Sequence, residues 1–410
     1  MIQIFIGFLL MILIICDQLN VNMESPVKIA LHLYHNYHFM LIVQGIVFLT
    51  GASMVMIFGN LLCRIIAMIF IILFLFLYHI AWDAGHMIHV IRGKNDKKMV
   101  RTTNNLTGPD PWEKDYWLTS DLPYDSSYPN SFMDIYNVEK VPTKKRPVFL
   151  YAHGGGYVFG DKSNGDPNAM GIAGIIRMIK MLLDQGFVVI STEYVFAPEY
   201  CYPAPIKQMD DLLHYLVKHA DEYGLDMEKI VFGGGSAGGQ IMAQTACLQT
   251  NPEYAKEMGI SAILDHGEIK AVYLGCSLLD NERFGKTSSF LTNYFFYQMG
   301  RAYFHNIGIL EGNSEVKQSN IITHVTKDYP ASFICDGNAG TFNQQAHDLD
   351  ERLTELGVMH TALIYDSPDD PKLIHGFDTL EYDIGKMCME QMTCFVSGQV
   401  QLYDSNYNLH

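Results

Sequence analysis

Charged residues are scarce in this chain of 410 residues: they make up 18% of the sequence, while hydrophobic residues make up 49%. Globular chains usually carry about 25% charged residues. Basic residues are the rarer kind, with 28 Lys and Arg against 44 Asp and Glu, which gives a net charge of -16. A nucleic-acid-binding protein needs clustered cations to neutralise phosphates. The charge balance therefore argues against nucleic acid as a partner.

Cysteine motifs and low-complexity segments are also missing. The 8 cysteines form no C-x-x-C pair and show no regular spacing, which gives no indication of a zinc ribbon or a disulfide framework and favours a reducing compartment. The 34 glycines and 15 prolines follow no repeating period, and the mean hydropathy is +0.07. Collagen-like sequence and intrinsic disorder are therefore excluded.

Long apolar runs occur only near the N-terminus. Residues 39–58 contain no charge, and residues 61–82 contain only Arg64. Each run is long enough to cross a hydrocarbon core of about 30 Å as a helix. Residues 1–16 form a third, shorter run, for which a third span and an interfacial helix both stay open. We expect residues 1–90 to form a membrane anchor, which makes the lipid bilayer a partner.

The charges beside these runs predict an orientation. Residues 1–100 hold six basic and four acidic residues, so the balance there is positive and the rest of the chain is markedly acidic. The basic residues gather just after the last run, at Arg92, Lys94, Lys97, Lys98 and Arg101. By the positive-inside rule, the multi-pass anchor places everything after residue 90 in the cytosol.

From residue 131 onward, short β-rich runs alternate with longer helical patterns. Runs such as 147–152 are continuously apolar, as a strand buried on both faces requires. The alternation predicts an α/β fold: a mostly parallel sheet with helices on both faces. We expect a linker with N-terminal cap elements at 91–130, the main domain at 131–410, and an aromatic cap insertion near 281–329 that lies over the site.

Two glycine-rich turns carry the candidate chemistry. Gly234-Gly-Ser-Ala-Gly238 follows a predicted strand and precedes a predicted helix, which is the setting of a nucleophile elbow with Ser236 at its tip. The second turn, His153-Gly154-Gly155-Gly156, directly follows strand 147–152. Its glycines allow backbone N–H groups to point at a ligand. A phosphate-binding loop is excluded because the G-x-G-x-x-G spacing is absent.

With these motifs and the stretch Tyr194-Val-Phe-Ala-Pro-Glu, the chain resembles the hormone-sensitive-lipase-like branch of the α/β-hydrolases over roughly residues 130–398. The resemblance implies a serine hydrolase without metal or cofactor. It implies Ser236 as the nucleophile and the N–H groups of Gly155, Gly156 and Ala237 as the oxyanion hole. His153, Gly154, Gly234 and Gly238 support the two motifs. This chain has Gly235 where the family usually has Asp.

The base and the acid must follow the serine in chain order. His375, in Leu373-Ile-His-Gly-Phe, is the candidate base because it lies between the last predicted strand and the last helix. Asp336, which ends strand 332–335, is either the acid of a triad or a turn-capping residue. The family usually places its acid a few residues later, where this chain has Gly340 and Thr341. Without Asp336, Ser236 and His375 would form a dyad.

These residues predict hydrolysis of a small-molecule carboxylic ester through an acyl-enzyme on Ser236, as in carboxylesterases, lipases or deacetylases. Tyr157, Tyr194 and Phe295 are the expected lining of the substrate pocket. The alternative is a catalytically weak hydrolase-fold protein that binds or scaffolds partners. Exposed apolar surface on the insertion could also support a homo-oligomer.

Overall fold

The computed structural model describes residues 61, 65, 68, 84–92, 107–109, 116–162, 174–265, 267–287, 290–307, 309–339, 342–366 and 373–401. The chain divides into two compact units, Met1–Lys97 and Lys98–His410. Of the first unit, the structure describes helix α5 (Ala84–Arg92) and the helical residues Leu61, Ile65 and Met68.

The membrane spans expected near 1–16, 39–58 and 61–82 lie outside the described residues, apart from those three helical positions. Within the described parts of the chain, no helix combines the length and the apolar character that crossing a bilayer requires.

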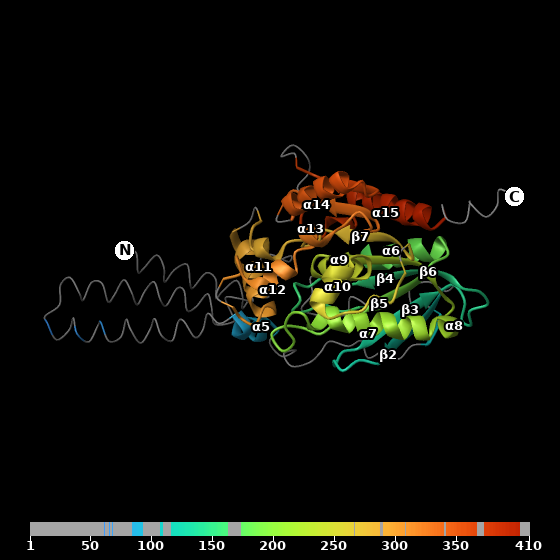
Figure 1. Ribbon diagram of the computed structural model, residues 1–410, viewed down its shortest axis with the longest axis horizontal. Coiled ribbons are helices and arrows are strands. Elements are labelled where there is room, and N and C mark those ends of the chain that lie inside the picture. The colour runs from blue at the N-terminus through green and yellow to red at the C-terminus, as the bar shows by residue number, and fades with distance from the viewer. Residues whose placement is uncertain are drawn as a thin grey trace, which may run out of the picture. The chain divides into compact units, whose positions relative to one another are not determined.

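The second unit is built on one sheet, several strands of which are labelled in Figure 1. The strand order is β1-β2-β3-β5-β4-β6-β7-β8-β9. The pairs β1–β2, β2–β3 and β3–β5 are antiparallel, and the remaining pairs are parallel. The mostly parallel sheet predicted from the sequence is therefore confirmed. The strands are β1 (Thr107–Pro109), β2 (Trp117–Pro123), β3 (Phe132–Asn137), β4 (Arg146–Ala152), β5 (Val188–Thr192), β6 (Leu225–Gly235), β7 (Ile269–Gly275), β8 (Ala331–Asp336) and β9 (His360–Ile364).

Part of the segment expected to be a linker, 91–130, extends this sheet. Strands β1 and β2 come from it and pair on the antiparallel side. The sequence alone did not indicate them, because only Leu118 and Asp121 of β2 are buried and the strand contains a register shift. Such a strand lacks the continuous apolar run that marks the central strands.

Alternate residues of the central strands face different helices, as the period of two in a strand requires. Phe149, Val189, Val231 and Tyr273 belong to one core with helices α6 (Gly174–Asp184) and α15 (Asp383–Gln401). The two helices also pack against each other. On the other side, α9 (Ala237–Thr250) packs on β6 and β7 and against α7 (Ala204–Lys218). Further helices are α8 (Ala220–Tyr223), α10 (Pro252–Met258) and α14 (Asn343–Leu356).

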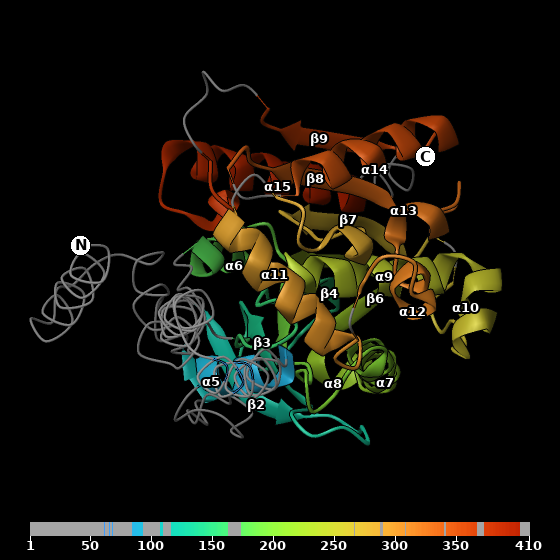
Figure 2. The same ribbon diagram turned by 90° about the vertical axis from the view of Figure 1, so that its left-hand side faces the viewer.

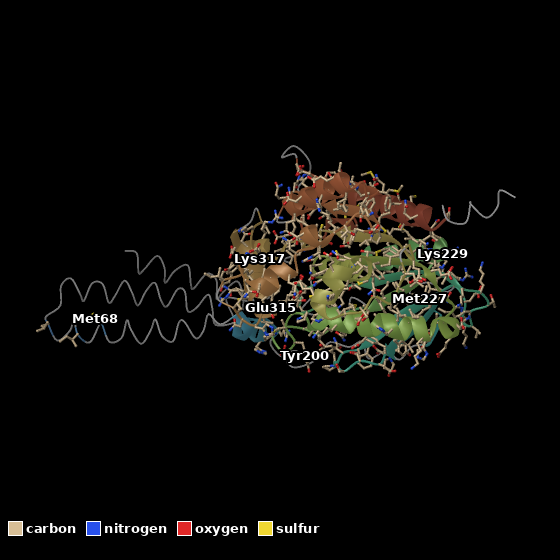
Figure 3. The ribbon with its side chains drawn as sticks, in the orientation of Figure 1. Met68, Tyr200, Met227, Lys229, Glu315 and Lys317 are labelled. Atoms are coloured by element: carbon tan, nitrogen blue, oxygen red, sulfur yellow. The ribbon has the colours of Figure 1, made fainter. Side chains whose placement is uncertain are left out.

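A helical insertion separates β7 from β8. It contains η2 (Asn281–Arg283), α11 (Phe290–Tyr303), α12 (Ser314–Gln318) and α13 (Ile321–His324), all within the predicted range 281–329. Figure 2 shows α11 crossing in front of the sheet. Glu315 and Lys317 on α12 lie at this end of the unit, while Lys229, near the start of β6, lies at the other end (Figure 3). We call residues 281–329 the cap.

The last helix begins later than its sequence pattern suggests. A helix is predicted from Asp378, but Phe377–Thr379 form the short 3-10 helix η3, and α15 starts at Asp383. Leu380 adopts an extended conformation between them (φ -83°, ψ 158°). Because an extended residue cannot continue a helix, Asp378 belongs to the loop that carries His375.

Candidate active site

Ser236 occupies the sharp turn between β6 and α9. Its backbone has φ 53° and ψ -119°, a conformation that is costly for a residue with a side chain. The turn is held by a hydrogen bond from the Ser236 N–H to the carbonyl oxygen of Gly275, at 2.8 Å. Gly238, on the first turn of α9, touches the backbone oxygens of Ala152 and His153 so closely that a Cβ there would collide with both. The strand, strained turn and helix are those of a nucleophile elbow.

The structure brings His375 to this serine. Nε2 of His375 lies 2.9 Å from Oγ of Ser236, within hydrogen-bond distance, across 139 positions of sequence. The His375 turn is anchored through Leu373, whose carbonyl oxygen accepts N–H groups from Asn338 and Ala339 in the loop after β8. A serine hydroxyl bound to an imidazole nitrogen is the pairing that activates a nucleophile.

The His375 ring forms a cluster with two aromatic side chains, whose own ring centroids are 5.3 Å apart. Phe296 of α11 and Phe342 each meet it edge to face, with ring centroids 5.3 Å away. Burial in these surroundings lowers the pKa of His375 to about 4. Nδ1 of His375 is buried and has no hydrogen-bond partner among the residues that the structure describes. The imidazole is therefore a neutral base at pH 7.

The described hydrogen bonds of Asp336 are to its own loop. Its side chain is buried at the end of β8, where the carboxylate accepts the N–H groups of Gly337 at 2.8 Å and of Phe342 at 3.1 Å. These bonds are those of a loop-capping residue. Gly340 and Thr341, where the resemblance places an acid, lie outside the described residues. The role of Asp336 as the triad acid stays a prediction.

The predicted oxyanion loop packs against the elbow. A Cβ on Gly154 would lie 3.4 Å from the Cβ of Ser236. Gly155 and Gly156 both have positive φ, at 133° and 60°, so their peptides turn in a way that side chains would oppose. Ala237 is the first residue of α9, and its N–H precedes the helical hydrogen-bond ladder. The loop and the helix start thus bring the three predicted donors to the same end of β4 and β6.

His153 is a buried support of that loop. Its ring stacks on Tyr194 at 4.4 Å, its Nδ1 lies 2.7 Å from the Gly154 carbonyl oxygen, and its Nε2 lies 3.4 Å from the Glu193 carboxylate. Burial by itself lowers the pKa of His153, but the hydrogen bond and charge of Glu193 outweigh it and raise the pKa. Both ring nitrogens face acceptors, which suits the protonated form.

The residues expected to line the substrate pocket have different surroundings. Tyr194 is buried, and its hydroxyl donates to the His153 carbonyl oxygen at 2.9 Å. Tyr157 is buried too, and it stacks on Tyr303 of α11 with centroids 3.8 Å apart. Phe295 is half-buried and contacts Tyr294. Their assignment to the substrate pocket stays a prediction.

Tyr157 also begins a polar network that runs into the cap. Its hydroxyl lies 3.1 Å from Gln240 Oε1 and 3.2 Å from Asn281 Oδ1. Gln240, on α9, donates to Gln244 and to the carbonyl oxygen of Ser319, and Asn281 donates to the Ser319 hydroxyl. All five residues are buried. The oxyanion loop, the nucleophile helix and the cap therefore share one set of hydrogen bonds.

Three residues that contact the site were not predicted from the sequence. Phe296 and Phe342 both meet the His375 ring, and Met299 fills the space beside Gly156. Phe296, Met299 and Tyr303 are spaced i, i+3, i+7, so they share one face of α11. That spacing in the aromatic run was the available signal, and Phe295 lies off this face.

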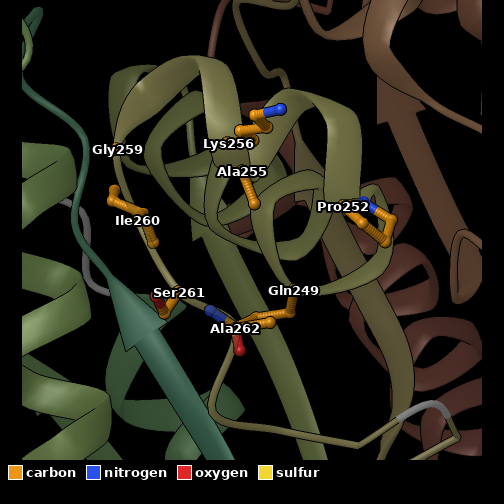
Figure 4. A pocket seen from close by; sticks show the side chains of 8 residues that line it. All are labelled: Gln249, Pro252, Ala255, Lys256, Gly259, Ile260, Ser261 and Ala262. Atoms are coloured by element: carbon orange, nitrogen blue, oxygen red, sulfur yellow. The ribbon is translucent and has the colours of Figure 1, made fainter.

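Neither a surface hollow nor a metal cluster adds to this site. A hollow of about 470 Å³ is lined by Gln249, Pro252, Ala255, Lys256, Gly259, Ile260, Ser261 and Ala262 (Figure 4). It lies at the C-terminal end of α9, about 20 Å along the helix from Ser236 at 1.5 Å per residue. In the described part of the chain, no group of three or more His, Cys, Asp or Glu side chains is arranged to hold a metal ion.

Comparison with known proteins agrees with this geometry. The profile of the BD-FAE family matches residues 133–353, which include the elbow, the oxyanion loop and the cap. The chain belongs to the BD-FAE family. Among solved structures, esterase B from Lactobacillus rhamnosis superposes with a TM-score of 0.56 at 18% identity, covering 72% of this chain and 90% of that one. The metagenomic carboxylesterase EstE1 gives 0.52 at 18% identity, with 79% and 97% covered. The fold is therefore that of an α/β-hydrolase.

Curated relatives of this BD-FAE chain are named esterases. Esterase LipC of Mycobacterium tuberculosis is 28% identical over 130 residues, 32% of this chain and 30% of the relative. The acetyl esterase of Salmonella paratyphi B is 33% identical over 124 residues, 30% of this chain and 35% of the relative. The chain thus matches about a third of the length of each. The resemblance to α/β-hydrolases is confirmed, and its hormone-sensitive-lipase-like branch stays a prediction.

Proposed function

We propose that this BD-FAE protein is a serine esterase that cleaves a small-molecule carboxylic ester. The observation that carries the proposal is the 2.9 Å contact between His375 Nε2 and the Oγ of Ser236 on a strained elbow. The names of the curated relatives support the same reaction class. His375 accepts the Ser236 proton as Oγ attacks the ester carbonyl, and the alcohol then leaves with that proton.

Backbone N–H groups of Gly155, Gly156 and Ala237 are the proposed donors to the oxyanion of the tetrahedral intermediate. One such donor contributes about 3 kcal/mol to lowering the barrier. Water then attacks the acyl-enzyme with His375 again as the base. No metal or cofactor takes part in the proposed steps.

Among the described residues, Nδ1 of His375 has no hydrogen-bond partner, and this favours slow turnover and a second candidate function. In serine proteases the carboxylate that orients the histidine is worth about 10⁴ in kcat. With Asp336 engaged by its own loop, the pair Ser236–His375 is the minimal catalytic unit. A binding or scaffolding protein with weak activity is the alternative that this observation favours.

Covalent labelling tests the esterase directly. A fluorophosphonate probe reacts only with an activated serine, so the wild type is expected to be labelled and Ser236→Ala is expected to stay unlabelled. Ser261→Ala, which removes a serine from the hollow in Figure 4, is the matched control and should be labelled like the wild type. An unlabelled wild type, or an equally labelled Ser236→Ala, would favour the scaffolding alternative.

We further propose that the N-terminal unit anchors the protein to a membrane, with the hydrolase domain in the cytosol. Besides the apolar runs, support comes from Leu61, Ile65 and Met68, whose i, i+4, i+7 spacing puts them on one helix face. Their side chains are 76%, 46% and 51% exposed. A homo-oligomer formed through the cap is also a proposal, which the exposed Ile309 supports.

Protease treatment tests the anchor and its orientation. The full chain is expected in the membrane pellet after an alkaline carbonate wash, and its hydrolase domain should survive protease added to intact cells. Permeabilised cells are the control in which the domain is digested. Recovery of the full chain in the soluble fraction would contradict the anchor, and digestion in intact cells would contradict the cytosolic orientation.

A further inference from the structure

A buried carboxyl group lies three residues after the candidate base. Asp378 belongs to η3, its side chain is 1% exposed, and the proposed reaction does not use it. Its carboxylate accepts a hydrogen bond from the hydroxyl of Tyr273 and a weaker one, at 3.5 Å, from the thiol of Cys276. Both donors come from the end of β7 and the residue that follows it.

The same two donors flank the peptide that holds the nucleophile. Gly275 lies between Tyr273 and Cys276 at the end of β7, and its carbonyl oxygen accepts the Ser236 N–H at 2.8 Å. A Cβ on Gly275 would lie 2.5 Å from Oδ2 of Asp378, so the carboxylate is packed directly against this residue. Asp378 therefore connects the loop of the base to the peptide that fixes the serine.

The turn around Asp378 is itself rigid. The Phe377 N–H bonds to the Ile374 carbonyl oxygen and the Thr379 N–H to the Gly376 carbonyl oxygen, both at 3.0 Å. Phe377 is buried in the core of α6 and α15. These two hydrogen bonds link the backbone of Asp378 to the backbone around His375. A shift of Asp378 would therefore move His375 with it.

A buried carboxylate is costly to keep unless it is well bonded. Here the described residues provide no acceptor for the His375 Nδ1 that would fix the ring. Among the described residues, the ring is held by its backbone and by its contacts with the rings of Phe296 and Phe342. A buried group that holds this backbone against β7 therefore helps to orient the His375 ring, which offsets the cost of its burial.

We propose that Asp378 is a positioning residue, which holds the His375 turn against the end of β7 and so sets the distance between His375 Nε2 and Ser236 Oγ. This inference rests on the proposed esterase function. Asp378 acts through the position of His375 and needs no contact with the substrate.

Three variants test the inference, with kcat and KM measured on p-nitrophenyl acetate. Asp378→Asn keeps an oxygen that accepts the Tyr273 hydroxyl but carries no negative charge. Its amide N–H group then faces the Cys276 thiol, which is itself a donor. Its kcat, calculated per serine titrated by fluorophosphonate, is expected to fall about 10- to 100-fold, because misplacing reacting groups by about 1 Å has that effect. KM should stay within about twofold, since substrate binding is untouched.

Tyr273→Phe removes one donor to the same carboxylate. A smaller decrease in kcat with unchanged KM is expected. This variant also tests the inference if Asp378→Asn does not fold. Asp350→Asn is the matched control. Asp350 bonds the side chain of His360 at 3.0 Å, and His360 begins β9 at the opposite, amino end of the sheet. This variant should keep the wild-type kcat.

The outcomes separate a positioning role from a merely structural one. If Asp378→Asn and Tyr273→Phe lower the melting temperature or the titrated fraction but leave kcat per titrated serine unchanged, the inference is overturned while the esterase stands. A wild type that neither reacts with fluorophosphonate nor hydrolyses the ester would instead overturn the proposed function, and the inference with it.

Discussion

The variant His375→Ala is expected to hydrolyse p-nitrophenyl acetate about 10²- to 10⁴-fold more slowly in kcat than the wild type, the usual contribution of a general base. The reason is the 2.9 Å contact of His375 Nε2 with Ser236 Oγ, which no other described histidine makes. His347→Ala is the matched control, because His347 is a half-exposed residue of α14 that pairs with Asp366 on the surface. Equal loss in both variants would contradict the assignment of the base.

The pH dependence of the wild type examines the same base. The neutral imidazole is the active form, and burial lowers its pKa to about 4. Activity therefore requires a pH above this value: kcat/KM should be level from neutral pH down to about pH 5 and fall below it, since kcat/KM reports the free enzyme. A fall centred near pH 6 to 7 would mean that a carboxylate pairs with Nδ1 and raises the pKa of His375.

The variant Gly155→Ala is expected to lose about 10²- to 10³-fold in kcat, as enzymes do when one oxyanion-hole donor is removed. Gly155 has φ 133°, and a Cβ there would collide with the carbonyl oxygen of Phe159. That oxygen cannot move freely, because Val158 and Phe159 both donate N–H groups to the Gly155 carbonyl and keep the turn closed. The whole loop would have to shift, and its N–H groups would leave the oxyanion position.

Gly357→Ala is the matched control for this loss. Gly357 also has positive φ, at 68°, but it ends α14 and has open space where a Cβ would stand. This variant should cost about 1 kcal/mol of stability and leave kcat unchanged. If Gly155→Ala lowered only the melting temperature, as Gly357→Ala should, the oxyanion assignment would be wrong.

The sequence was sufficient for the parts of the site that depend on local backbone geometry. A glycine-rich turn between an apolar strand and a helix has few possible conformations, so the elbow at Ser236 and the loop at His153–Gly156 could be placed from residue type and spacing. The parallel sheet was predictable for the same reason, because strands such as β5, buried along its whole length, need continuous apolar runs.

The parts that depend on contacts between distant segments could not be predicted. Asp378 had the pattern of a helix start, and only the packing of its loop on β7 reveals a buried carboxylate bonded to Tyr273. Phe296 and Phe342 contact His375 from different parts of the chain, which no local spacing encodes. Asp336 is the clearest example. A carboxylate after a strand can cap its own loop or orient a histidine, and the sequence around Asp336 is compatible with both roles.

The network of Tyr157, Gln240 and Asn281 has a consequence for protein engineering. Exchanging the cap for that of another hydrolase is a common way to seek new specificity, but here the cap provides Asn281 and the Ser319 carbonyl oxygen to buried groups of the main domain. A foreign cap lacking these acceptors would remove one of the two partners of each group, so that Tyr157 would keep only Gln240 and the Gln240 amide only Gln244. Each lost hydrogen bond costs about 0.5–1.5 kcal/mol. In this chain the cap is not an interchangeable module unless Asn281 is kept and the backbone at 319 stays in place.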